Sequence, residues 1–175
     1  LLDGGDRRFV EAVIDREAMC TLLFTSGTTG QSKGVMLSHK NISANVYNMS
    51  KYVNIRTGGG LSVLPMHHTY ELTCHVFTAI YQGVFVAICE GLRYIQPNLK
   101  ESGASVMLGV PIVFETMHKK VWKQAEASGA ADKMKKMMAL SRRTKMFNQP
   151  KVMRKVFDKI HSSLGGNIDL FIAGG

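Results

Sequence analysis

Short apolar runs alternate with amphipathic segments along most of the chain. The runs are four to six residues long and end at Gly, Pro or Ser/Thr clusters, as buried strands typically do. We predict strands at Cys20–Thr25, Gly34–Leu37, Leu61–Leu64, Val84–Cys89, Ser105–Val110 and Ile168–Ile172.

Helical segments lie between these strands. Ser38 is suited to cap a helix from about Lys40 to Val53, because its hydroxyl can accept a backbone N–H at the helix start. Pro111 suits the first turn of another helix, where the missing N–H of proline is not needed. Further helices are predicted at Tyr70–Gln82, at Arg93–Ser102 with a break at Pro97, and on a stripe of Met153, Phe157, Ile160 and Leu164.

This alternation predicts a doubly wound α/β fold, with a mostly parallel sheet covered by helices on both faces. A chain of 175 residues is the size of one domain and can bury roughly 70% of its unfolded surface. It begins without Met and stops in an apolar run at Phe171–Gly175. We therefore expect a fragment of a longer protein.

The segment Thr25–Gly34, between the first two predicted strands, concentrates the chemistry. It combines three glycines with a series of hydroxyl side chains and Lys33. Glycines permit positive φ, so that successive N–H groups can point into one concavity, while hydroxyls and a lysine add ligands for phosphate oxygens. The glycine spacing and the Gly34 that follows the lysine exclude a P-loop of the nucleoside triphosphatase kind. The alternative to a phosphate-binding loop is a flexible hairpin turn. Such a turn does not need so many hydroxyl side chains and a lysine, so it does not account for this composition.

Thr25–Gly34 resembles the signature of the adenylate-forming superfamily, which includes acyl-CoA synthetases, luciferases and the adenylation domains of peptide synthetases. Ser32 departs from the family pattern, which usually has proline there, and leaves the loop less stiff without removing a phosphate donor. Weaker similarities follow in the family's order at Leu64–His68, Val110–Glu115, Phe157–Ile160, Leu164–Gly166 and Ala173–Gly175. Val110–Glu115 resembles the long-chain members of the family.

The resemblance implies roles for the matching residues. The implied ligands of the ATP phosphates are Thr25, Ser26, Gly27, Thr28, Thr29 and Gly30. Thr28 would also contact Mg²⁺, and Gly174 with Gly175 would flank the adenine. The implied catalytic residues are Lys33, near the pyrophosphate, and His68, near the reacting carboxylate.

The implied activity is ATP-dependent conversion of a long-chain fatty acid to an acyl-adenylate, followed by thioester formation with coenzyme A. ATP, Mg²⁺ and coenzyme A would be the cofactor and co-substrates. Residues 1–175 would be part of the N-terminal AMP-binding domain, with the C-terminal domain absent and the fragment alone inactive. Two alternatives stay open: loading of a carrier protein instead of coenzyme A, and a non-catalytic ATP-binding relative.

Positive charge is concentrated near one part of the chain. The net charge is +9, and residues 132–159 hold ten basic and two acidic residues. Such a segment is usually a solvated face, and weak attraction to an anionic membrane surface is the alternative. No nucleic-acid-binding module accompanies it, so we expect no nucleic acid partner.

The cysteines and histidines bear on location and on metal binding. Three cysteines without CxxC spacing predict reduced thiols and a cytoplasmic protein, and no apolar run approaches the ~20 residues of a membrane span.

His67, Glu71 and His75 recur every four residues, which would suit a zinc site on one helical face. The order of these residues does not match the HExxH pattern of zinc-binding helices, and a packing role fits His75 better.

Overall fold

The computed structural model describes residues 8–26, 32–53, 55 and 58–174. The chain divides into two compact units, Leu1–Asn48 and Met49–Gly175, each with its own internal contacts.

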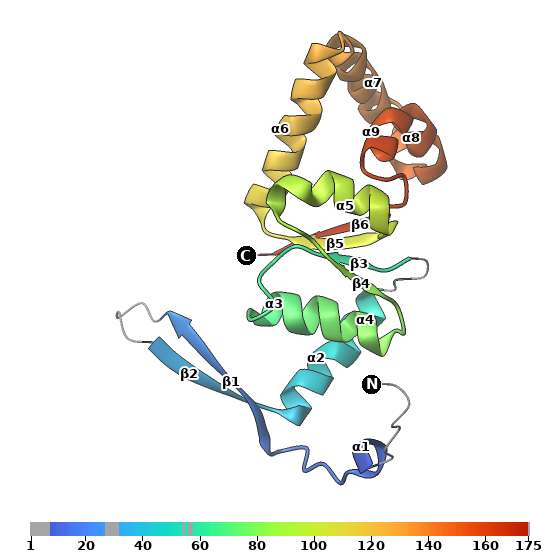
Figure 1. The fold of residues 1–175 in the computed structure, drawn as a ribbon. Helices are drawn as coiled ribbons and strands as arrows, with labels where there is room; N and C mark the ends of the chain where they lie inside the picture. The colour runs from blue at the N-terminus through green and yellow to red at the C-terminus, as the bar shows by residue number, and fades with distance from the viewer. Residues whose placement is uncertain (1–7, 27–31, 54, 56–57, 175) are drawn as a thin grey trace. The chain divides into compact units, whose positions relative to one another are not determined.

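The first unit contains a short helix, α1 (Arg8–Glu11), and an antiparallel hairpin of β1 (Met19–Ser26) and β2 (Ser32–Ser38) (Figure 1). This hairpin confirms the strands predicted on both sides of the glycine-rich loop. Because the strands pair up to Ser26 and Ser32, the loop residues between them join two antiparallel strands.

Helix α2 (His39–Tyr52) follows β2 directly and has the predicted cap. The backbone N–H of Asn41 donates to the Ser38 hydroxyl at 3.3 Å, and the Ser38 N–H donates to Asn41 Oδ1 at 2.9 Å. This reciprocal pair satisfies two backbone donors at the helix start, and such a cap typically stabilises a helix by about 1 kcal/mol.

The second unit is built on a parallel sheet with the strand order β4-β3-β5-β6. Its strands are β3 (Gly60–Ser62), β4 (Val86–Ile88), β5 (Val106–Gly109) and β6 (Leu170–Ala173). Each overlaps a predicted apolar run, with ends that differ by up to two residues. The parallel order confirms the predicted α/β class.

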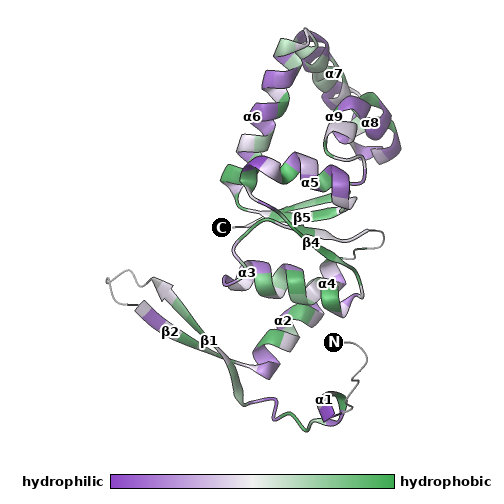
Figure 2. Ribbon diagram, viewed as in Figure 1, coloured by the Kyte–Doolittle hydropathy of each residue, from purple (hydrophilic) through white to green (hydrophobic). Residues whose placement is uncertain are grey.

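Helices cover both faces of this sheet (Figure 1). One face carries α3 (Thr69–Glu71), the π-helical segment η1 (Leu72–Phe77), α4 (Thr78–Tyr81) and the chain that follows α2. The other carries α5 (Ile95–Ser102), α6 (Pro111–Ala127) and α9 (Asp158–Ser163). Side chains of β5 alternate between the two cores: Met107 joins the second, and Val106 and Leu108 join the first. Figure 2 shows the resulting hydrophobic strands between helices of mixed character.

Two predicted helices differ from those observed. Pro97 does not break its helix, because it occupies the third position of α5, where backbone N–H groups have no partner within the helix. The stripe from Met153 to Leu164 is not one helix. It divides at Phe157 into α8 (Pro150–Val156) and α9, since Phe157 has a non-helical φ of −110° and ψ of 28°.

The basic segment also consists of several pieces. Helix α7 (Ala131–Arg143), a short 3₁₀ turn η3 (Met146–Asn148), α8 and α9 together carry it. Pro111 begins α6 as predicted. Among the helices in the described ranges, none is both long and apolar enough to cross a bilayer.

Candidate active site

The glycine-rich loop connects two strand ends that present a hydroxyl and an ammonium group together. Thr25 in β1 is the direct cross-strand partner of Lys33 in β2, and both are exposed. Directly opposed residues of an antiparallel pair point to the same face. Ser26 pairs with Ser32 at the last described position before the loop. The other predicted phosphate ligands, Gly27, Thr28, Thr29 and Gly30, lie outside the described residues, as does Gly175.

A second group of residues lies at the carboxyl edge of the parallel sheet. The chain leaves β3 toward the face that carries α3, whereas it leaves the neighbouring β5 toward the opposite face, where α6 lies. Adjacent strands whose connections diverge form a topological switch point, and open α/β sheets bind ligands outside the carboxyl ends of strands at such points. His68 follows β3, and Gly174 follows β6, the neighbour of β5 on its other side.

Tyr70 contacts Gly174 at this edge. A Cβ atom at Gly174 would lie 2.7 Å from Cζ of the Tyr70 ring, so this close approach requires glycine. The Tyr70 hydroxyl donates to the carbonyl of Ile172 at 3.2 Å, and the Gly174 N–H donates to the carbonyl of Gly109 at 3.1 Å. Burial raises the pKa of the Tyr70 hydroxyl, and its neighbours Cys74 and Glu71 add to the shift. The phenol therefore remains a hydrogen-bond donor at neutral pH.

His68 is exposed and has a structural role that the sequence did not reveal. It is the N-cap of α3, and its Nδ1 accepts the backbone N–H of Tyr70 at 3.2 Å. While this cap is formed, Nδ1 carries no proton, and Nε2 is the nitrogen that can donate to a ligand. His68 and Gly174 are thus linked through Tyr70, which sequence analysis missed. An aromatic residue two positions after His68, at the start of a helix that follows a buried strand, was the available signal.

Glu71 and His75, in the same helical segment, form a buried hydrogen-bonded pair. Nδ1 of His75 is 2.7 Å from Oε1 of Glu71, and neither side chain is exposed. The second oxygen of Glu71 and Nε2 of His75 have no hydrogen-bond partner. Within the described ranges no group of three or more His, Cys, Asp or Glu residues could hold a metal ion. His75 is fully buried and hydrogen-bonded to Glu71, which agrees with the packing role expected for it.

Comparison with known proteins identifies the family. Residues 4–175 match the family model described as AMP-binding enzyme. The chain is 35% identical over 130 residues to a long-chain-fatty-acid–[acyl-carrier-protein] ligase of Arabidopsis thaliana, covering 73% of this chain and 17% of that protein. It is 29% identical over 171 residues to long chain acyl-CoA synthetase 2 of the same plant, covering 89% of this chain and 26% of that protein. The chain thus spans about a quarter or less of these relatives.

Solved structures share the fold. ATP-bound MatB from Rhodopseudomonas palustris aligns with a TM-score of 0.55 at 22% identity, covering 93% of this chain and 25% of that one. The o-succinylbenzoate CoA synthetase of Bacillus subtilis aligns with a TM-score of 0.55 at 21% identity, covering 61% of this chain and 22% of that one.

Proposed function

Because the chain belongs to the AMP-binding enzyme family, we propose that it forms part of a ligase that activates a long-chain fatty acid with ATP. A carboxylate oxygen of the acid attacks the α-phosphorus of ATP, and the bond to the bridging oxygen breaks to release pyrophosphate. The thiol of coenzyme A, after losing its proton, then attacks the acyl carbonyl and displaces AMP. The similarity to two kinds of fatty-acid ligase supports this substrate class.

The hairpin loop is proposed to bind the ATP phosphates. Thr25, Ser26 and the residues Gly27–Gly30 would surround them with N–H groups and hydroxyls. The observation that carries this role is the direct pairing of Thr25 with Lys33, which places a hydroxyl and a positive charge at the mouth of the loop. Lys33 would stabilise the charge that develops on the leaving pyrophosphate.

Mg²⁺ fits the composition of this loop. The ion takes oxygen ligands and is usually held by substrate phosphates together with one or two protein groups, a role proposed for Thr28. When bound, it would neutralise charge on the phosphates. The hydroxyls and Lys33 would position the same phosphates without it.

The carboxyl edge of the sheet is proposed to receive the adenylate. Gly174 and Gly175 would flank the adenine, and His68 would donate from Nε2 toward the reacting carboxylate. The support is the switch point between β3 and β5, together with the close contact of Tyr70 with Gly174, where no side chain covers the backbone.

We also propose that this chain is part of a larger N-terminal domain, completed by a separate C-terminal domain. The two-stranded hairpin exposes large apolar side chains, including Phe24 at 71% and Met36 at 72%. An isolated hairpin is marginally stable in water, and such side chains are usually covered in an intact domain.

The proposed cytoplasmic location would be tested on the same full-length protein by cell fractionation.

The thiol acceptor is the point on which two functions differ. Coenzyme A is the proposed acceptor, and a carrier protein is the second candidate because one relative at 35% identity is named as an acyl-carrier-protein ligase. The test is ATP–pyrophosphate exchange by the full-length enzyme with acids of different length, followed by product analysis with each acceptor. We expect acid-dependent exchange and an acyl-CoA product. Exchange with transfer only to the carrier protein would select the second candidate, and no exchange with any acid would refute both.

A further inference from the structure

Glu71 and His75 attach the helical segment that starts after His68 to the strand β3. Both side chains are fully buried, and Nδ1 of His75 is 2.7 Å from Oε1 of Glu71, so that one proton lies between the two atoms. On its other side the imidazole fills the space beside Gly60, the first residue of β3. The pair therefore fixes this segment against the strand that leads into the candidate active site.

Stability does not explain why this pair is polar. Within the part of the chain that the structure describes, Oε2 of Glu71 and Nε2 of His75 have no hydrogen-bond partner. Burying polar atoms without partners opposes folding, and replacing a buried polar pair with well-packed apolar side chains is often neutral or stabilising. Apolar contacts have no direction, however, whereas a hydrogen bond requires a defined distance and angle. A fixed orientation of the segment is what this pair can provide.

The residues just before the pair face the carboxyl edge of the sheet. Successive residues of a helix are turned by about 100° around its axis, so Tyr70 points in another direction when Glu71 is turned toward β3. The Tyr70 ring lies against Gly174, and its hydroxyl donates to the carbonyl of Ile172 at 3.2 Å. Nδ1 of His68 accepts the Tyr70 N–H at 3.2 Å. A rotation of the segment about its axis would therefore move the phenol and the imidazole together.

The backbone changes its geometry at the same point. Leu72–Phe77 form the π-helical segment η1, and Glu71 is its N-cap residue. The Thr78 hydroxyl donates to the carbonyl of Thr73, five residues earlier, at 3.1 Å. π-Helical turns are rare and frequently occur at functional sites. His75 lies inside this turn, so its hydrogen bond to Glu71 spans the junction between α3 and η1.

We infer that Glu71 and His75 are positioning residues, which hold the first turn of α3 so that Nε2 of His68 and the ring of Tyr70 keep their places at the carboxyl edge, where the adenylate forms. Neither residue touches the substrate, because both are fully buried, and each acts through the first turn. The inference rests on the proposed function, since that function directs His68 toward the reacting carboxylate.

The first test is the kinetics of ATP–pyrophosphate exchange in the full-length enzyme. Glu71→Leu leaves His75 without its partner and should lower kcat about tenfold to a hundredfold, because displacements of about 1 Å near reacting groups have effects of this size. The KM for ATP should stay near that of wild type, since the loop proposed to hold the phosphates lies elsewhere in the chain. Glu71→Gln, which keeps a hydrogen bond to Nδ1 of His75, should restore most of kcat.

Two controls separate positioning from a general loss of stability. Gln82→Leu removes two hydrogen bonds at the far end of the same helical stretch, to the Ile55 N–H and the Val53 carbonyl, and should lower the denaturant midpoint without lowering kcat. Glu71→Leu combined with His75→Leu leaves neither member of the pair without its partner. Its stability should exceed that of Glu71→Leu alone, while kcat stays low. Recovery of kcat together with stability, or an equal loss of kcat in Gln82→Leu, would overturn the inference.

Crystal structures of the same full-length variants test the inference without measuring activity. In Glu71→Leu the hydrogen bonds from Tyr70 to His68 and to Ile172 should be broken or displaced, and in Glu71→Gln they should be kept. Unchanged positions of His68 and Tyr70 in Glu71→Leu would overturn the inference. A wild-type enzyme without exchange activity toward any acid would refute the proposed function, whereas a displaced His68 in Glu71→Leu would still support the positioning role.

Discussion

The imidazole of His75 occupies the space that a side chain at Gly60 would need: a Cβ atom there would lie 1.8 Å from Nε2. The other ring nitrogen of His75 is paired with Glu71, so the ring is held from both sides. Gly60 begins β3, and Glu71 follows Tyr70 in the segment that carries the candidate active site. The absence of a side chain at Gly60 therefore allows η1, which carries His75, to pack closely on β3.

Gly60→Ala should destabilise the protein by about 1–3 kcal/mol, because an added methyl overpacks a filled core. The measurement is the denaturant midpoint of the full-length protein. In Gly60→Ala with His75→Ala the two costs should not add, and the coupling free energy should exceed about 0.5 kcal/mol. Additive costs would show that the two residues do not compete for space.

Gly174→Ala should slow adenylate formation by up to about a hundredfold. The new Cβ would displace the Tyr70 ring or the backbone at the sheet edge, and small displacements near reacting groups carry costs of this size. Single-turnover kinetics would measure the step, and Tyr70→Leu in the same chain should recover part of the rate. A wild-type rate for Gly174→Ala would remove this edge from the proposed active site.

Lys33→Ala and Thr28→Ala should each slow pyrophosphate exchange about a hundredfold, since the loss of one contact to a developing anion costs roughly 3 kcal/mol. Circular dichroism and the unfolding midpoint should stay unchanged. Lys40→Ala is the control, because Lys40 forms an exposed ion pair with Glu17 outside the loop. Normal exchange in both loop variants would contradict the phosphate-binding role.

Stability should fall in alkaline solution in part through Tyr70 and Cys74. Burial raises the pKa of the Cys74 thiol, and burial with nearby charges raises that of Tyr70. The folded protein therefore holds both protons to higher pH than the unfolded chain. This stabilisation is complete below the ordinary thiol pKa of about 8.5 and is lost as pH rises through the raised values.

The measurement is the unfolding free energy from about pH 8 to about pH 11. Tyr70→Phe and Cys74→Ala should each flatten its decline, whereas Tyr52→Phe, at a residue that is 88% exposed, should not. If the unfolding free energy of Tyr70→Phe and Cys74→Ala fell with pH as steeply as that of wild type, these two residues would not be the source of the alkaline destabilisation.

The basic segment 132–159 should bind anionic vesicles weakly. Each basic residue near such a surface contributes about 1 kcal/mol at most, and salt screens the attraction within about 8 Å at physiological ionic strength. Replacing Lys135, Lys136 and Arg143 with Ser should reduce co-sedimentation at low salt. Replacing Lys119, Lys120 and Lys123 on α6 removes the same charge elsewhere and should have less effect. Equal binding to neutral vesicles would leave the solvated face as the explanation.

The sequence was sufficient where neighbouring residues decide the structure. The Ser38 cap, the Pro111 start and the apolar strands were predictable because hydrogen bonds and backbone preferences within a few residues determine them. The same local logic misjudged Pro97, since its effect depends on where the helix begins. The hydroxyl-rich loop identified the family because its composition is confined to ten consecutive residues.

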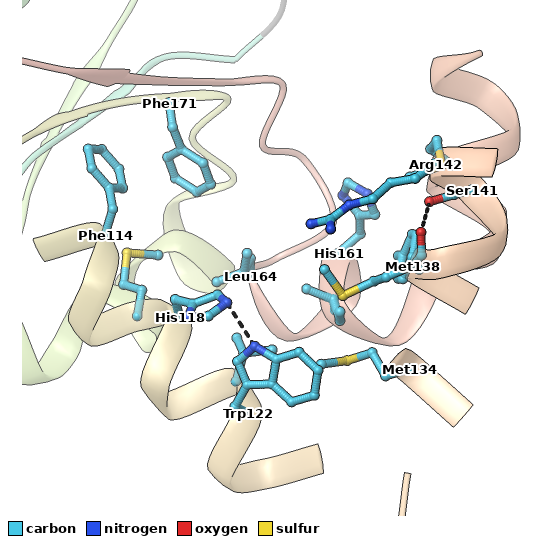
Figure 3. A pocket seen from close by; sticks show the side chains of 15 residues that line it. Phe114, His118, Trp122, Met134, Met138, Ser141, Arg142, His161, Leu164 and Phe171 are labelled. Carbon is cyan, nitrogen blue, oxygen red and sulfur yellow. Dashed lines mark hydrogen bonds between the residues drawn. The ribbon is translucent and has the colours of Figure 1, made fainter. Parts of the chain in front are cut away.

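The tertiary structure alone decided which distant residues meet. Tyr70 contacts Gly174, more than one hundred positions away, because the parallel strands bring their carboxyl ends to one edge. Met117 and Val121 of α6 line a cavity to which α7 also contributes residues (Figure 3), and no local sequence pattern reveals such an enclosure. Periodicity determines which face of a helix is apolar. The distance from that face to the facing element depends on how the whole chain packs, and that distance decides whether the space between them is filled or hollow.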